Sequence, residues 1–150
     1  MAKARLGVLL VLAAAVACSW RTIHTASYAT MSEARAAGAI ERGWVPAALP
    51  EKAYELRAAY DVNGPERWGL FNFREADAEA VRAAIQPQEL SLTGTVMDIP
   101  PRIEWWPVIL RNRLDAERIS TTGLRAYHAR SGDLTFAINW RQGRGYYWSE

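Results

Sequence analysis

The sequence contains few cysteines and histidines. Cysteines form the disulfides that stabilise many small domains, and both residue types often build metal and catalytic sites. It has one cysteine, Cys18, and two histidines, His24 and His128, in 150 residues. One cysteine excludes an intramolecular disulfide, so a packed core has to stabilise the domain. A chain of this length can bury a core of sufficient size. Neither histidine has a nucleophile or further metal ligands near it in the sequence. We therefore expect no catalytic residues, no metal and no cofactor.

The chain also lacks an excess of either charge once its N-terminus is set aside. Two of its 18 basic residues, Lys3 and Arg5, precede Cys18, and the 16 that remain balance the 16 acidic residues. A protein that binds nucleic acid needs a clear basic excess or stripe on its surface. We expect no nucleic acid as a partner, and a local patch of arginines between Arg111 and Arg130 is the alternative that stays open.

Long hydrophobic runs are absent except near the N-terminus. Leu6–Ala17 carries no charged or polar side chain, follows two basic residues and ends in the small residues Ala15-Val16-Ala17. This order of charged, apolar and small residues is that of a secretory signal. The run has about twelve residues, whereas a transmembrane helix needs about twenty. We predict a signal peptide over residues 1–17.

The residues around the cysteine indicate how the chain is retained after export. Ala15-Val16-Ala17-Cys18 resembles the lipobox of bacterial lipoproteins, with alanine at a first position that is usually leucine. The resemblance implies that Cys18 becomes the new N-terminus and carries diacylglycerol and a fatty acyl group such as palmitate. Ser19 resembles an outer-membrane sorting signal, which implies an outer-membrane location facing the periplasm if the cell is Gram-negative. Ordinary signal cleavage, an uncleaved anchor or an incidental cysteine are the alternatives.

Helix signals occur at three places in the mature chain. Thr30 and Glu33 fit a capping box, which predicts a short helix over about Ser32–Ala37 that ends at Gly38. Apolar residues at helical spacing predict an amphipathic helix over Glu75–Ile85. Within 104–113, Pro107 favours a helix that begins near it. We expect residues 18–29 to be a tether or an initial extended segment, and residues 30–150 to form a single domain.

Strand signals form two hairpin units. Alternating apolar residues over 54–60 and a second run over 67–73, joined by the turn 61–65, predict the first hairpin, although propensity leaves a helix open over 53–59. Residues 124–130 and 134–141 flank a second turn, and 146–148 make a last short strand. We predict an α+β domain whose antiparallel sheet comes from the two hairpin units, with helices packed on one face.

One segment of the sequence resembles a known family. The residues that carry the resemblance are Tyr28-Ala29-Thr30, Gly38, Gly43-Trp44-Val45-Pro46, Leu49-Pro50, Tyr60-Asp61, Asn63, Trp68, Phe71 and Phe73. Over residues 28–73 the chain resembles small bacterial exported or lipid-anchored proteins with a YbbD-type head domain. The resemblance implies a cell-envelope protein and carries over no catalytic residues.

The candidate ligand-binding residues combine aromatic and polar side chains. Indole and phenol faces beside Asp and Asn suit peptides or glycans, whereas the structural alternative is that the polar pair forms a turn and the aromatic residues fill the core. The candidates are Trp44, Tyr60, Asp61, Asn63, Trp68, Trp105 and Trp106. We predict a membrane-tethered envelope lipoprotein with a non-catalytic binding or structural domain, whose partner is an envelope protein or a glycan.

The alternative function is an envelope hydrolase that acts on peptidoglycan or glycan through paired carboxylates. Glu104 beside Trp105 and Trp106 suggests it, because aromatic faces stack on sugars and glycoside hydrolysis needs two carboxylates at a suitable separation. Gly143-Arg144-Gly145 is not a phosphate loop, because it has no following helix and no Lys-Ser/Thr pair. A tight turn between strands explains these glycines.

Overall fold

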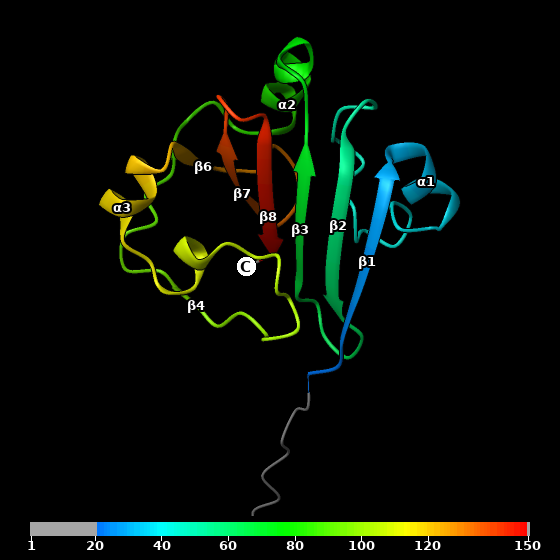
Figure 1. Cartoon of the computed structure of the whole chain (residues 1–150), viewed down its shortest axis with the longest axis horizontal. Coiled ribbons are helices and arrows are strands. Elements are labelled where there is room, and N and C mark those ends of the chain that lie inside the picture. The colour runs from blue at the N-terminus through cyan, green and yellow to red at the C-terminus, as the bar shows by residue number, and fades with distance from the viewer. Residues whose placement is uncertain (1–20, 150) are drawn as a thin grey trace, which may run out of the picture.

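A single antiparallel sheet organises the computed structural model, which describes residues 21–149 (Figure 1). Its six strands are arranged in the order β1-β2-β3-β8-β7-β6. They are β1 (Ile23–Thr30), β2 (Tyr54–Asp61), β3 (Arg67–Asn72), β6 (Leu124–His128), β7 (Leu134–Asn139) and β8 (Arg144–Ser149). The two predicted hairpins are confirmed as β2–β3 and β6–β7, and β8 joins them by pairing with both β3 and β7.

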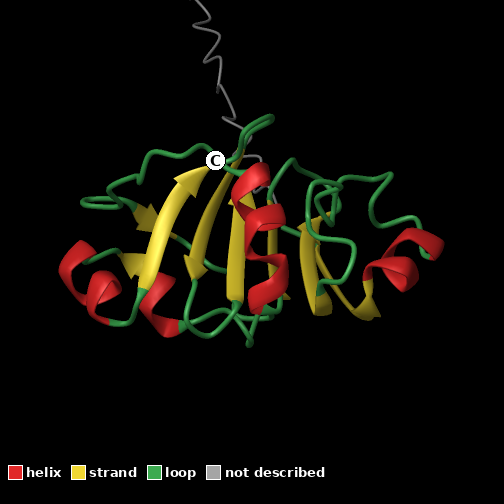
Figure 2. Ribbon diagram, turned by 90° about the horizontal axis from the view of Figure 1, so that it is seen from above, coloured by secondary structure: helices red, strands yellow, loops and turns green. Residues whose placement is uncertain are grey.

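Short helices and a small ribbon complete the α+β domain. The α-helices are α1 (Met31–Ala36), α2 (Ala78–Ala84) and α3 (Ala116–Thr121). Single 3₁₀ turns, η1 (Glu75–Asp77) and η2 (Val108–Leu110), and the paired strands β4 (Val96–Met97) and β5 (Asn112–Arg113) lie between them. Figures 1 and 2 show α1 beside β1 at one end of the sheet and α3 at the opposite end.

The predicted helix cap is confirmed at α1. The Thr30 hydroxyl accepts a hydrogen bond from Glu33 N–H at 3.1 Å, and the Glu33 carboxylate accepts one from Ala29 N–H at 2.8 Å. Gly38 follows the helix with a φ of 75°, a left-handed conformation that ends helices and favours glycine. The local sequence therefore determines both ends of this helix.

The predicted α+β class is confirmed, but helices cover both faces of the sheet and not one. On one face α1 and α2 pack through Met31 and Val81 against Phe71, Phe136 and Tyr147. The other face is covered by α3 and the segment before it, with Ile119, Trp106 and Leu110 against Trp68, Tyr146 and Trp148. A strand such as β7, which is buried along its whole length, needs a layer on each side.

Two further elements differ from the prediction. The helix expected from Pro107 is only the turn η2, because the buried Trp106 indole donates to the Leu110 carbonyl at 2.8 Å and the Arg111 side chain donates to the carbonyls of Ile103 and Trp106. These bonds replace the helical ones. The prediction omitted α3, although its signal is present: the Asp115 side chain caps the N-terminus by accepting from two backbone N–H groups.

Of the two alternatives for residues 18–29, the initial extended segment agrees with the first strand. Residues 23–29, within this range, form most of β1, which is paired with β2 from Ile23–Asp61 to Thr30–Tyr54. The sequence of β1, IHTASYAT, has no regular apolar alternation, in agreement with a strand in which only Ile23 is buried. The signal peptide, Cys18 and Ser19 lie outside the described residues. Within residues 21–149, no helix is both long and apolar enough to span a membrane.

Candidate functional site: a groove on the sheet

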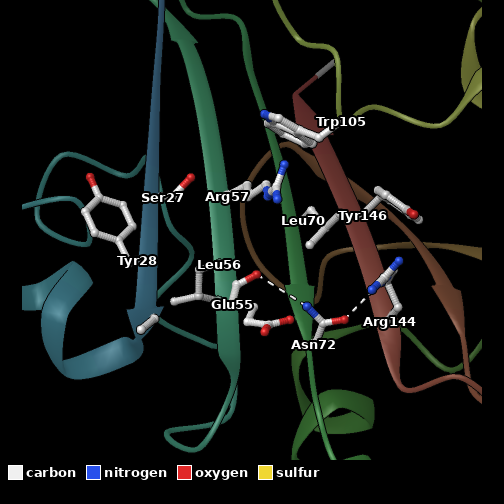
Figure 3. A pocket seen from close by; sticks show the side chains of 11 residues that line it. Ser27, Tyr28, Glu55, Leu56, Arg57, Leu70, Asn72, Trp105, Arg144 and Tyr146 are labelled. Atoms are coloured by element: carbon white, nitrogen blue, oxygen red, sulfur yellow. Dashed lines mark hydrogen bonds between the residues drawn. The ribbon is translucent and has the colours of Figure 1, made fainter.

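A groove of about 480 Å³ lies over the part of the sheet formed by β1, β2, β3 and β8 (Figure 3). Four of its residues form one row across these strands, because Ser27 pairs with Arg57, Arg57 with Leu70, and Leu70 with Tyr146. The next row contains Asn72 and Arg144. We call this hollow the sheet groove. It lies on the same face as the core around Trp106, beside the edge of that layer.

A buried amide fixes the floor of the sheet groove. Asn72 is 5% exposed, and its Nδ2 donates to the carbonyls of Tyr54 and Glu55 at 3.4 and 3.3 Å. Here β2 has a register shift, and Glu55 has a φ of 48°, an uncommon conformation for a residue with a side chain. The Asn72 Oδ1 accepts from Arg144 Nε at 2.9 Å. One side chain therefore holds the bulge and orients an arginine.

The sheet groove contains more positive than negative charge. Arg57 and Arg144 lie on either side of Leu70, and neither forms an ion pair with any described residue (Figure 3). Glu55 supplies the one carboxylate of the lining. Some exposed arginines of the domain have acidic partners, such as Arg35 with Glu51 at 2.9 Å, and others, such as Arg141, have none among the described residues, so what marks Arg57 and Arg144 is that they share one groove. Two guanidinium groups without acidic partners in one groove have the chemistry that binds a carboxylate or a phosphate.

An indole forms one wall of the sheet groove. Trp105 is half-buried, and its ring lies 6.0 Å from that of Trp106, which is 1% exposed. Trp106 in turn packs against Tyr146 and Trp148, with ring centroids 5.7 and 5.9 Å apart. The Arg111 side chain donates to the carbonyls of Ile103 and Trp106 and so holds the backbone on both sides of Trp105. The wall is therefore rigid, flat and apolar.

The structure brings together only some of the predicted ligand-binding residues. Trp44 and Tyr60 stack at 3.7 Å with their planes 7° apart, and Arg42 lies 4.9 Å above Trp44, on the face of the sheet opposite to the sheet groove. Trp68 and Trp106 are buried in the other core. Trp105 alone of the seven candidates lines the sheet groove.

Asp61 and Asn63 lie in the turn of the first hairpin. The Asp61 carboxylate accepts from Thr22 N–H at 3.1 Å and from Asn63 N–H at 3.0 Å, and the Asn63 amide donates to the Thr22 hydroxyl at 3.0 Å. These bonds join the turn to the start of β1. The arrangement agrees with the structural alternative for this pair.

The remaining candidates for chemistry are dispersed. His24 lies on β1, 5.8 Å from the Tyr60 ring, and His128 ends β6. Glu104 is exposed, and it does not line the sheet groove. Across residues 21–149, no three His, Cys, Asp or Glu side chains gather in a way that would hold a metal ion.

Sequence reasoning did not identify Arg57, Asn72 or Arg144 as site residues. A weak signal existed for Arg57, which lies on the polar side of the alternating strand, and for Arg144, which stands between two glycines. Neither signal shows that β3 and β8 are neighbours. Only that pairing places Asn72 opposite Arg144 and completes the site.

Comparison with known families agrees with the resemblance found in the sequence. The family model of the YbbD head domain matches residues 22–72, which comprise β1, α1, β2 and β3. No curated protein and no solved structure matches the chain. The match indicates a bacterial envelope protein. The matched segment contributes Ser27, Arg57 and Asn72 to the sheet groove, and β8 and the segment around Trp105 complete it.

Proposed function

Starting from the YbbD head domain that residues 22–72 match, we propose that this chain is a lipid-anchored envelope protein whose domain binds an anionic ligand in the sheet groove without transforming it. The supporting observation is the pair Arg57 and Arg144, which have no acidic partner among the described residues and lie beside the Trp105 wall. Cys18 would carry the lipid.

The chemistry of the lining defines the ligand class. A guanidinium group binds a carboxylate or phosphate through two parallel N–H donors, and such charge-assisted bonds are stronger than neutral ones. The Trp105 face offers apolar contact for a sugar ring or an apolar side chain. An acidic glycan or an acidic peptide satisfies both features, and both are components of a bacterial envelope.

The sheet groove offers little to a hydrolase. Glycoside hydrolysis requires two carboxyl groups across the scissile bond. Among the described residues that line the cleft beside Trp105, Glu55 alone has a carboxylate. We therefore propose binding as the function of this site.

Replacing Cys18 with alanine is expected to move the protein from the membrane to the soluble fraction. Two or three acyl chains retain a protein because each buried CH₂ contributes about 0.8 kcal/mol, and alanine has no thiol to acylate. The measurement is the distribution of the protein between pelleted membranes and supernatant. Ser19→Ala is the matched control and should stay with the membrane. Unchanged retention of the Cys18→Ala variant would contradict the anchor.

Removing both groove arginines is expected to weaken binding of an acidic glycan by about tenfold or more, because each charge-assisted bond contributes on the order of 1.5 kcal/mol. The probe is a soluble peptidoglycan fragment whose sugar carries a carboxylate, and the readout is quenching of tryptophan fluorescence, since Trp105 lies in the groove. Arg57→Ala/Arg144→Ala is compared with Arg141→Ala, which removes an exposed arginine outside the lining. Equal affinity of the two variants would reject the sheet groove as the site.

A further inference from the structure

The first strand leaves one edge of the sheet open. β1 is outermost, and its eight residues include no charged residue and no proline. Proteins usually protect such edges with charge, proline or a covering segment. The opposite edge, β6, has a covering segment, because Gln86 N–H donates to the His128 carbonyl at 2.9 Å and Leu90 N–H to the Ala126 carbonyl at 2.7 Å. No such backbone segment pairs with the outer edge of β1 among residues 21–149.

The direction of each backbone group along β1 follows from the bonds at its ends. The Thr22 carbonyl accepts from Val62 N–H at 2.9 Å, so the backbone N–H and C=O groups of even-numbered residues point toward β2. The backbone N–H and C=O groups of odd-numbered residues therefore point away from the sheet. This agrees with Ala29, whose N–H donates to Glu33, and with Ile23, whose carbonyl accepts from Arg102 at 3.3 Å.

Between these two ends lies an unpaired stretch of backbone. The N–H and C=O groups of Thr25 and Ser27 point outward, and no described residue bonds to them. Both residues are exposed. We call this stretch the β1 window: it runs from Ile23 to Ala29, with the Arg102 guanidinium at one end and the Glu33 carboxylate at the other.

We propose that the β1 window binds a short extended peptide with free termini, antiparallel to β1, its N-terminus at Glu33 and its C-terminus at Arg102. The inference deepens the proposed function and rests on it in one respect, since one peptide side chain enters the sheet groove. An added strand gains the main-chain hydrogen bonds that Thr25 and Ser27 leave unmade.

The end charges select the direction of the peptide. An antiparallel strand places its terminal ammonium beside Glu33 and its carboxylate beside Arg102, whereas a parallel strand would place like charges together. The positions from Ile23 to Ala29 span roughly 20 Å at about 3.4 Å per residue, which fits a peptide of about five to seven residues.

Each end of the β1 window holds one charged side chain, Arg102 at the start of β1 and Glu33 at its end. A hollow of about 570 Å³ adjoins the start of β1, and its lining includes Ile23, Pro100, Pro101 and Arg102 together with the ion pair of Arg21 and Asp98. Arg102 forms no ion pair with a described residue, whereas Arg21 in the same hollow is paired with Glu66 and Asp98. At the other end α1 stands beyond the edge of β1 and limits how far a strand extends (Figures 1 and 2).

The sheet groove specifies one side chain of the peptide. In an antiparallel pair, opposite residues point to the same face, so the peptide residue opposite Ser27 points to the groove face. Ser27 is small and lies next to Arg57 in the register. An acidic side chain at this third peptide position reaches over Ser27 toward the Arg57 guanidinium.

The test is calorimetric titration of the full chain, in detergent, with a seven-residue peptide of small β-favouring residues and glutamate at its third position. We expect binding that weakens about tenfold when either terminus is blocked by acetylation or amidation. Glu33→Gln should lower the affinity for the peptide with a free N-terminus and leave the affinity for the acetylated peptide unchanged. Arg102→Gln should lower the affinity for the peptide with a free C-terminus and leave that for the amidated peptide unchanged. The amide of the Glu33→Gln variant would still accept the bond that caps α1, so folding is retained.

A second variant tests the backbone bonds. Thr25→Pro removes an outward N–H that no described residue uses, and it should abolish peptide binding with little change in melting temperature. No binding of the peptide, or binding that is indifferent to blocked termini, overturns the inference. If the unmodified chain is a dimer and the Thr25→Pro variant is a monomer, a second copy of the chain occupies the edge of β1, and the inference is also overturned. If the peptide fails while the acidic glycan still binds, the proposed function stands; loss of both rejects both.

Discussion

Replacing Gly69 with alanine is expected to lower the free energy of unfolding by about 3 kcal/mol or more and the melting temperature by about 10 °C. Gly69 lies in β3 opposite Tyr147, and an added Cβ would stand 1.8 Å from Tyr147 Cζ. The ring has no room to move, because Tyr147 is 1% exposed and its hydroxyl donates to the Trp44 carbonyl at 2.7 Å. Burial raises the pKa of this phenol, so it remains a neutral donor.

Two comparisons separate this clash from other effects of losing a glycine. Gly132→Ala is the matched control, because Gly132 has a φ of 87° and nothing within 4 Å of an added Cβ, so its cost is only that of backbone strain, about 1 kcal/mol. In a Tyr147→Ala background the Gly69→Ala change should cost far less, which a double-mutant cycle measures by thermal unfolding. A loss as small as that of Gly132→Ala would contradict the packing described.

Replacing Asn72 with alanine is expected to cost about 2 kcal/mol of stability and to weaken ligand binding in the sheet groove. The change leaves the carbonyls of Tyr54 and Glu55 without their donor and frees the Arg144 guanidinium to leave the groove. The bulge at Glu55 loses the amide that holds its uncommon backbone conformation. Chemical denaturation and titration with the acidic glycan measure the two losses.

Arg144→Ala is the matched control for the Asn72 variant. Arg144 is exposed, so its removal should reduce binding while stability changes by less than about 1 kcal/mol. Asn72→Ala should reduce both. An Asn72→Ala protein with full stability would show that the bulge holds its shape without the amide, and the floor of the sheet groove would need another explanation.

Local signals in the sequence predicted much of the fold. The cap at Thr30 and Glu33, the alternation in β2 and the turn between β6 and β7 each depend on residues within a few positions of one another. Such short-range features can be read from one segment at a time. The sequence left a tether and an extended segment as alternatives for β1, and it predicted a helix where only the η2 turn forms, because both elements depend on the layers packed around them.

The sequence predicted fewer features of the candidate site than of the fold. Of the seven candidate residues only Trp105 lines the sheet groove, whereas Trp68 and Trp106 are core residues and Asp61 with Asn63 forms a turn. The surroundings of a tryptophan depend on which face of which strand lies beneath it. Sequence spacing contains no information on that.

Signals within single segments were enough to predict the two hairpins, the helix capped by Thr30 and a resemblance to the YbbD head domain that the family match confirms. Contacts between distant segments set the rest: β8 pairs with both β3 and β7, β1 forms an open edge, and Arg57 and Arg144 share one groove. Hydrogen bonds and caps within a segment depend on neighbouring residues. The sheet groove depends on the register between β3 and β8, where Asn72 meets Arg144 from 72 positions away in the chain, and only the folded sheet brings the two together.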